Sequence, residues 1–129
     1  MTDEDLLEAA KKSRMQSYSP YSHFAVGAAA LANGKVYGGC NIENASYPVG
    51  ICAERVAMAK AVADGAREIE ALAVVADTPA PCTPCGMCRQ MMAEFHVHRI
   101  ILGNMGGAKQ VLRMEELLPG AFAGEDLCR

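Results

Sequence analysis

Two short segments of the sequence carry residue types that bind metals and move protons. They are Cys52-Ala53-Glu54-Arg55 and Pro84-Cys85-Gly86-Met87-Cys88. Each segment stands where a helix is expected to begin, and a helix N-terminus lowers the pKa of a thiol. Positions i and i+3 of a helical turn share a face, so Cys85 and Cys88 can reach one ion. Our interpretation is a zinc site formed by these two residues and Cys52, with the fourth position open for water.

Glu54 follows Cys52 by two positions and is not needed as a ligand. Zinc lowers the pKa of bound water to ~7, and hydrolytic chemistry of this kind needs a general acid or base. We therefore predict that Glu54 moves protons. Three thiolates around a divalent ion leave a charge of about −1, which opposes a low water pKa. We predict that Arg55 offsets part of this charge by donating to the sulfurs.

Cys82 leaves two other interpretations of the cysteines open. With Cys85 and Cys88 it forms a C-x2-C-x2-C run, but an iron–sulfur motif needs its fourth cysteine where this sequence has Met92. A closed structural zinc site could also use Cys52 and all three cysteines of that run, which would leave no open position. Loss of zinc in a Cys82→Ser variant would favour this closed site.

The hydrophobic pattern predicts alternating helices and strands. Helices are expected over residues 2–17, 53–63, 86–95 and 114–118, the first with a capping box of Thr2 and Asp5. Strands are expected over residues 26–31, 35–40, 71–76, 99–102 and 108–112, the first two joined by an Asn33-Gly34 turn. This order predicts an α/β fold, a three-layer α/β/α sandwich with a mixed five-stranded sheet, in one domain over residues 1–129. The last two strands are expected to be antiparallel because their connection is too short for a crossover.

Composition argues against several classes of protein. The net charge is −3 and no basic run occurs, so a nucleic-acid partner is not expected. The longest apolar stretch, near residues 25–32, is too short to cross a membrane. The N-terminus shows no signal peptide, and six cysteines without one indicate thiols or metal ligands rather than disulfides. We therefore expect a cytoplasmic protein that binds a small, uncharged molecule.

Five blocks of the sequence stand in an order and spacing that are specific to one family. They are Tyr18-Ser19-Pro20-Tyr21-Ser22-His23-Phe24, Gly39-Cys40-Asn41-Ile42-Glu43-Asn44-Ala45-Ser46-Tyr47, Cys52-Ala53-Glu54-Arg55, Pro84-Cys85-Gly86-Met87-Cys88-Arg89-Gln90 and Glu116-Leu117-Leu118-Pro119. Together they resemble the zinc-dependent cytidine deaminases, specifically the small homotetrameric class with three cysteine ligands. The resemblance implies one Zn²⁺ per subunit on Cys52, Cys85 and Cys88. It also implies hydrolytic deamination of cytidine and deoxycytidine, with Glu54 as the proton carrier, in pyrimidine salvage.

The resemblance also implies how the nucleoside is held. Phe24 matches a residue that lies against the pyrimidine ring, and Asn41 and Glu43 match residues that hydrogen-bond the ribose hydroxyl. Backbone groups near Ala53 are expected to contact the amine, and Tyr47 belongs to the same expected substrate site. From the residues alone, Asn41 and Glu43 would instead serve the backbone of a neighbouring loop.

Phe122 matches a phenylalanine that reaches the active site of a neighbouring subunit. The resemblance therefore implies a homotetramer whose sites lie near subunit interfaces. From the residues alone, the ring could equally cap the core of its own chain.

The sequence departs from the family pattern at Met87, where a small residue is common, and at Val56, where threonine is usual. Met87 is bulky enough to change the preference for the base or the leaving group. One alternative function is deamination of a modified cytosine nucleoside or of a blasticidin-S-type substrate on the same scaffold. An alternative of another class is a non-catalytic, structural zinc-binding homologue, against which the presence of Glu54 argues.

Overall fold

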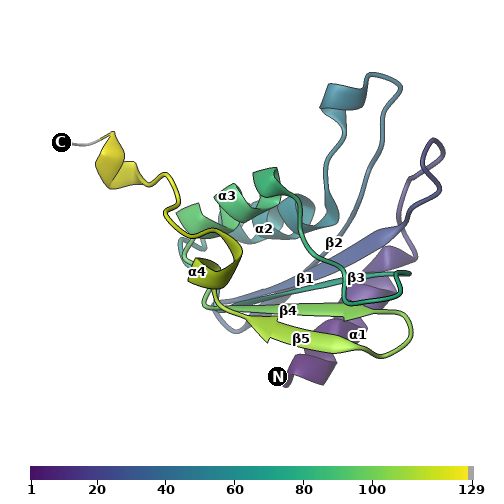
Figure 1. Cartoon of the computed structure of the whole chain (residues 1–129), viewed down its shortest axis with the longest axis horizontal. Coiled ribbons are helices and arrows are strands. Elements are labelled where there is room, and N and C mark those ends of the chain that lie inside the picture. Colours follow the sequence, from purple (N-terminus) through teal and green to yellow (C-terminus); the bar gives the residue numbers. More distant parts are fainter. Residues whose placement is uncertain (128–129) are drawn as a thin grey trace.

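A computed structural model of the chain describes residues 1–127 and shows helices on both sides of a sheet (Figure 1). The elements are α1 (Asp3–Arg14), β1 (Val26–Ala32), β2 (Lys35–Cys40), α2 (Ala53–Ala63), β3 (Ala71–Ala76), α3 (Gly86–Glu94), β4 (Arg99–Asn104), β5 (Lys109–Leu112) and α4 (Met114–Leu117), with single 3-10 turns at Tyr47–Val49 and Gly124–Asp126. The helix and strand types therefore agree with the sequence predictions, and the boundaries agree within a few residues.

The strands within residues 1–127 form one mixed sheet in the order β2-β1-β3-β4-β5. β3 pairs with β4 in parallel, while β1–β2, β1–β3 and β4–β5 are antiparallel. Every residue of β3 is buried, as expected for a central strand covered on both faces. The predicted mixed five-stranded sheet with an antiparallel last pair is confirmed.

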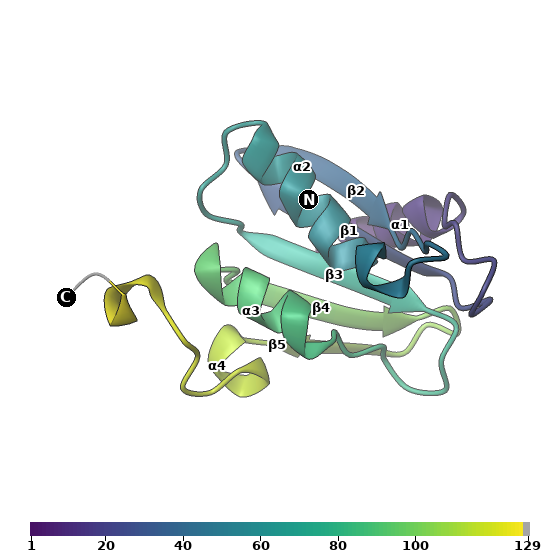
Figure 2. The same cartoon turned by 90° about the horizontal axis from the view of Figure 1, so that it is seen from above.

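Successive residues of β3 face the two helical layers. Ala71, Ala73 and Val75 pack with Leu6 and Ala10 of α1 on one face. Their neighbours in the strand belong to the larger core beneath α2 and α3 on the other face: Leu72, Val74 and Ala76. Figure 2 shows α2 and α3 lying side by side over this second face, so that their N-terminal ends point the same way.

The β1–β2 hairpin turns at Asn33 and Gly34, which have φ values of 51° and 74°. Two positive φ values are the requirement of a type I′ turn, which an Asn-Gly pair meets at low cost. This turn fixes the register in which Ala32 faces Lys35 and Gly27 faces Cys40. It therefore fixes which residues of the two strands lie opposite one another.

Helix α1 starts with the predicted capping box of Thr2 and Asp5 but ends at Arg14, earlier than expected. Past Arg14 the chain makes a tight turn, in which the Ser17 amide donates to the Arg14 carbonyl at 3.1 Å. The Arg14 side chain donates from Nε to the Ala25 carbonyl at 2.9 Å. This tertiary contact fixes the end of the helix against the start of β1.

Within residues 1–127, no helix has both the length and the apolar character required to cross a bilayer.

Candidate metal centre and active site

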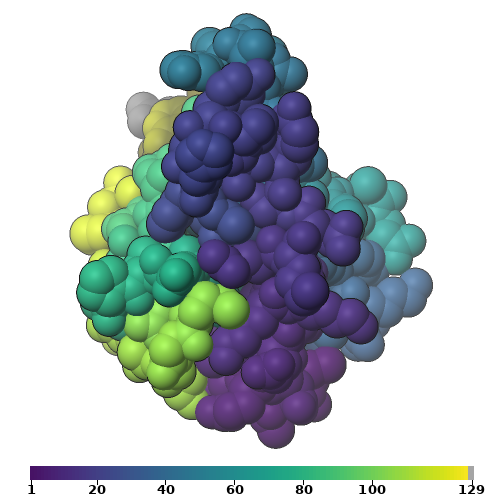
Figure 3. All heavy atoms as spheres, turned by 90° about the vertical axis from the view of Figure 1, so that its right-hand side faces the viewer, coloured from purple at the N-terminus to yellow at the C-terminus, as the bar shows by residue number. Residues whose placement is uncertain are grey.

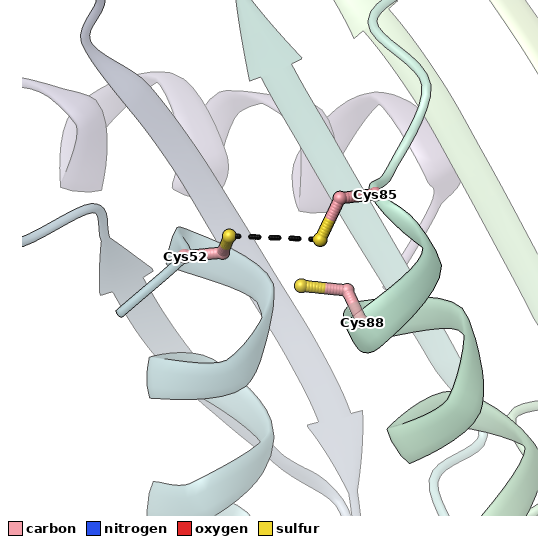
Figure 4. A group of neighbouring side chains, drawn as sticks. All are labelled: Cys52, Cys85 and Cys88. Atoms are coloured by element: carbon pink, nitrogen blue, oxygen red, sulfur yellow. Dashed lines mark hydrogen bonds between the residues drawn. The ribbon is translucent and has the colours of Figure 1, made fainter. Parts of the chain in front are cut away.

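Three cysteine thiols meet at the N-terminal ends of α2 and α3. Cys52 is the N-cap residue of α2, Cys85 is the N-cap residue of α3, and Cys88 lies in the first turn of α3. Figure 4 shows their sulfur atoms pointing toward one another from the two helices. All three sulfurs lie within 4.8 Å of one another, and the Cys52 and Cys85 sulfurs are 3.7 Å apart.

This arrangement fits a tetrahedral zinc ion. A Zn–S bond of ~2.3 Å in a tetrahedron separates two sulfurs by about 3.8 Å. The observed 3.7 Å between Cys52 and Cys85 agrees with that separation. Cys88 is buried, Cys52 is half-buried and Cys85 is exposed, so the cluster is accessible at Cys85. Three thiol ligands leave the fourth position of a tetrahedral zinc ion open, and an accessible cluster lets a small molecule reach that position.

Cys82 lies near this cluster but is not part of it. Within the described part of the chain, the sulfurs that could share one ion are those of Cys52, Cys85 and Cys88 alone. Burial, with a smaller contribution from the charge of Glu54, raises the pKa of the Cys82 thiol to about 11. The geometry therefore favours the open three-cysteine site over the closed four-cysteine site.

The environment of Cys52 favours its thiolate form. Hydrogen bonding with Cys88 and the nearby Arg55 guanidinium lower the pKa of the Cys52 thiol to about 5, although partial burial opposes the shift. The same interaction with Cys52 raises the pKa of Cys88. The cluster thus readily holds negative charge, and thiolates are the form of cysteine that binds metals.

Arg55 lies beside these sulfurs. Burial opposes its charged form, but the Cys52 and Cys88 sulfurs raise its pKa above the usual range, so the guanidinium stays charged. Its Nη2 atom reaches the Gly50 carbonyl at 3.5 Å, while its buried Nε has no hydrogen-bond partner among residues 1–127. A buried donor without a partner next to thiols is consistent with the expected charge-balancing role.

Glu54 is a buried carboxyl group beside the cluster, with 4% of its surface exposed. Burial raises its pKa to about 7, the charge of Cys52 adds to the shift, and Arg55 opposes it. A carboxyl group with such a pKa can both take up and release a proton at neutral pH. The structure therefore places a buried carboxyl group with a pKa near neutrality next to the thiols.

Asn41 holds the loop that carries Phe24. Its amide oxygen accepts from the Val26 backbone amide at 2.9 Å and from the Ser17 hydroxyl. Its amide nitrogen donates to the Phe24 carbonyl at 2.7 Å. Asn41 is half-buried, and the backbone groups on either side fix the orientation of its side chain.

Glu43 binds the same loop at Tyr21 and Ser22. One carboxylate oxygen accepts from the backbone amides of Tyr21 and Ser22, at 3.0 and 3.1 Å, and the other accepts from the Ser22 hydroxyl. The Ser22 hydrogen bonds lower the pKa of Glu43. Both Asn41 and Glu43 therefore make the contacts to loop backbone that the residues alone favoured.

The other expected substrate residues occupy different surroundings. Ala53 is fully buried at the start of α2. The rings of Phe24 and Tyr47 are 43% and 77% exposed. The rings of Tyr47 and Tyr21 pack together, with their centroids 6.2 Å apart. Tyr47 and Glu43 both line a cavity of about 360 Å³. The structure thus brings Tyr47 and Glu43 to one cavity.

Phe122 does not cap the core of its own chain, since 56% of its surface is exposed. Figures 1 and 2 show the segment after α4 leading away from the body. The Gln90 side chain of α3 holds this segment by donating to the Phe122 carbonyl at 2.9 Å.

Three further residues have structural roles that sequence reasoning did not assign. Ser17 and Ser22 orient Asn41 and Glu43. Arg89 donates to the carbonyls of Pro84 and Leu117, at 2.9 and 2.8 Å, and so joins the loop before Cys85 to α4. The partners of these residues lie 5 to 28 positions away in the chain, and no local pattern indicates such contacts.

Fold and cluster together define a class of metal-binding α/β/α protein, in which two helix N-termini present three thiols beside a buried carboxyl group. The chain belongs to the cytidine and deoxycytidylate deaminase family: a sequence model described as "Cytidine and deoxycytidylate deaminase zinc-binding region" matches residues 1–104. The family is zinc-binding, and the cluster of Cys52, Cys85 and Cys88 could hold such an ion.

Individual relatives agree with this assignment. The chain is 52% identical to a cytidine deaminase of Sporosarcina psychrophila, over 98% of this chain and 96% of the relative. It matches a crystal structure of cytidine deaminase from Burkholderia pseudomallei with a TM-score of 0.91 and 49% identity, over 95% of this chain and all of the other. A blasticidin-S deaminase of Bacillus cereus is 26% identical over 91% of this chain and 89% of the relative. The comparisons therefore favour the cytidine deaminases over the blasticidin-S alternative.

Proposed function

We propose that this chain catalyses the hydrolytic deamination of cytidine and deoxycytidine to uridine or deoxyuridine and ammonia, as a step of pyrimidine salvage. The reaction replaces the bond between ring carbon 4 and the amine nitrogen with a carbon–oxygen bond from water. Residues 1–129 would act as one catalytic domain. The observation that carries the proposal is the convergence of three thiols beside the buried Glu54.

Cys52, Cys85 and Cys88 would hold the zinc ion of this family. When bound, zinc supplies a Lewis acid that makes water nucleophilic at neutral pH. Glu54 takes a proton from the attacking water, delivers it to ring nitrogen 3, and then helps to protonate the leaving amine. Its pKa of about 7 suits both halves of this transfer. Arg55 limits the negative charge that accumulates around the sulfurs.

The proposal is tested by the ultraviolet absorbance of cytidine in the presence of the purified protein. Cytidine absorbance is expected to fall, the loss should stop after treatment with a zinc chelator, and added zinc should restore it. Unchanged cytidine in the presence of the zinc-loaded protein would refute the proposal. Deoxycytidine, tested in parallel, establishes whether the second substrate is used.

We further propose that the nucleoside contacts Phe24 through its ring and Asn41 and Glu43 through a ribose hydroxyl, with Ala53 backbone near the amine. Support comes from the Asn41–Phe24 hydrogen bond, which links a sugar-binding position to the ring-binding position. Tyr47 lines the cavity next to Glu43 and would close the site from the sugar side.

We also propose a homotetramer whose active sites lie near subunit interfaces, in the cytoplasm. Large apolar side chains are exposed on two neighbouring segments, as expected of a surface that another subunit covers: Tyr18, Tyr21, Phe24, Ile42, Tyr47, Val49 and Ile51. The exposure of Phe122 supports a role in another subunit. A cytoplasmic location would keep the ligand thiols reduced. Sedimentation equilibrium is expected to give the mass of four chains.

Complementation tests the role of Phe122 directly. Chains carrying Glu54→Gln and chains carrying Phe122→Ala are co-expressed, so that mixed oligomers form. If Phe122 serves a neighbour, an intact Glu54 in one chain can meet Phe122 of another, and activity should exceed the sum of the two variants. Activity equal to that sum would assign Phe122 to its own chain.

A further inference from the structure

The carboxylate of Glu43 has a nearly complete set of hydrogen-bond donors. A carboxylate has about four lone-pair positions, two on each oxygen. The backbone amides of Tyr21 and Ser22 fill both positions on Oε1, at 3.0 and 3.1 Å. The Ser22 hydroxyl fills one position on Oε2. Within residues 1–127, Glu43 is left with one acceptor position, and that position lies on Oε2.

The side chain of Asn41 can be counted in the same way. Its oxygen accepts two hydrogen bonds, from the Val26 amide and the Ser17 hydroxyl, and is filled. Its nitrogen carries two hydrogens, and one of them goes to the Phe24 carbonyl at 2.7 Å. Among the described residues, one N–H of Asn41 therefore has no partner.

The open acceptor position on Oε2 of Glu43 can be filled by a hydroxyl group, which donates, whereas an ether, a carbonyl or a fluorine cannot donate to Glu43. Glu43 and Ser22 line the cavity of about 360 Å³, which lies within the size range of small-molecule sites. Figure 3 shows the indigo Tyr18–Phe24 loop at the surface directly beneath the blue segment that bears Tyr47.

Ser22 decides which acceptor position stays open. Both backbone amides bind Oε1, so the Ser22 hydroxyl is the contact that orients Oε2. The Phe24 amide donates to this hydroxyl at 3.0 Å, which directs its single proton toward Glu43. Ser22 therefore links two groups of the proposed site. One is the backbone of Phe24, whose ring would contact the base, and the other is the Glu43 carboxylate, which would bind the sugar hydroxyl.

We propose that Ser22 is a positioning residue for nucleoside recognition, which holds Glu43 so that one acceptor remains for one sugar hydroxyl. The inference rests on the proposed function and deepens it, since it assigns a specificity role to a residue that acts through Glu43. Ser17 has the matching position on Asn41, but backbone groups also fix both ends of that amide. Ser22 should therefore matter more than Ser17.

The test compares Ser22→Ala with the unaltered protein on two ligands. Cytidine carries the sugar hydroxyls, while 2′,3′-dideoxycytidine lacks both secondary ones and is measured as a competitor of cytidine deamination. Loss of a hydrogen bond to a charged group should raise KM for cytidine about tenfold and change kcat less than about twofold. The inhibition constant of dideoxycytidine should change less than about twofold. Ser22→Thr, which keeps the hydroxyl, should restore the KM for cytidine.

Ser19→Ala is the matched control, because its hydroxyl lies in the same loop and contacts Ser17 at 3.3 Å rather than Asn41 or Glu43. This variant should keep both constants. If Ser22→Ala weakens cytidine and dideoxycytidine equally, Ser22 merely supports the loop and the inference is wrong. If the unaltered protein leaves cytidine unchanged, the proposed function fails, which is a distinct result.

A second measurement uses the unaltered protein and does not depend on how any variant folds. Cytidine analogues with fluorine in place of one sugar hydroxyl at a time are compared with analogues that carry hydrogen there. At one position, fluorine should cost as much affinity as hydrogen, about tenfold, because it cannot donate to Oε2 of Glu43. If fluorine retains the affinity of the hydroxyl at every position, the donor–acceptor count is refuted.

Discussion

Gly39 of β2 lies against the first turn of α2, where a Cβ atom at position 39 would come within 2.5 Å of the Ala53 carbonyl oxygen. The same atom would lie 2.6 Å from the Ala57 amide nitrogen. Both contacts are with backbone, which cannot turn aside as a side chain can. Ala53 directly follows Cys52. The close approach of Gly39 to Ala53 therefore sets how far the Cys52 thiol lies from the sheet.

Replacing Gly39 by alanine should therefore disturb the metal centre. Overpacking against backbone typically costs about 1–3 kcal/mol and shifts the helix, so Gly39→Ala should lower the melting temperature and the zinc content together. Gly106→Ala is the control, since its Cβ would meet only the Asn104 side chain at 3.6 Å. Zinc content and melting temperature like those of the unaltered protein would show that α2 does not depend on Gly39.

Two serine substitutions separate the three-cysteine site from the four-cysteine site. Cys85→Ser should lose most of the bound zinc, because one of the three convergent sulfurs is gone. Cys82→Ser should keep about one zinc per chain, because its thiol stands outside the group. Metal analysis of the purified variants measures both. Zinc loss from Cys82→Ser would overturn the assignment of ligands.

Glu54→Gln should bind zinc normally and lose turnover by about 10²–10⁴-fold, the usual contribution of a general acid or base. The amide keeps the size of the side chain but cannot carry the proton. Zinc content and kcat are measured on the same preparation, with the exposed Glu94→Gln on α3 as the control. A kcat within a few fold of normal would remove Glu54 from the mechanism.

Arg55→Ala should move the acidic limb of the pH–rate profile to higher pH. The positive charge of Arg55 favours the more negative protonation state of its surroundings, so its removal makes deprotonation harder and shifts the limb upward. The profile of kcat/KM measures this shift. Arg67→Ala serves for comparison, because Arg67 binds the Val62 carbonyl at the far end of α2. If Arg55→Ala leaves the limb where it was, Arg55 has no charge-balancing role.

Much of the local structure follows from short-range patterns. The Asn33-Gly34 turn, the capping box at Thr2 and the limits of α2 can be predicted because each depends on residues a few positions apart. Cys85 and Cys88 share a helical turn for the same reason. Helical and strand periodicity is a property of the backbone, so the residue pattern is enough to reveal it.

The sequence by itself determined the order of helices and strands, the residue types of the metal centre and, through its five blocks, the family. Only the tertiary structure decided that Cys52 and Cys85, 33 positions apart, bring their sulfurs to 3.7 Å. It also decided that Ser22 orients Glu43 across 21 positions, and that the Arg14 side chain binds the Ala25 carbonyl across 11. Such contacts depend on strand order, register and helix height, which arise when the whole chain packs and which no local pattern records.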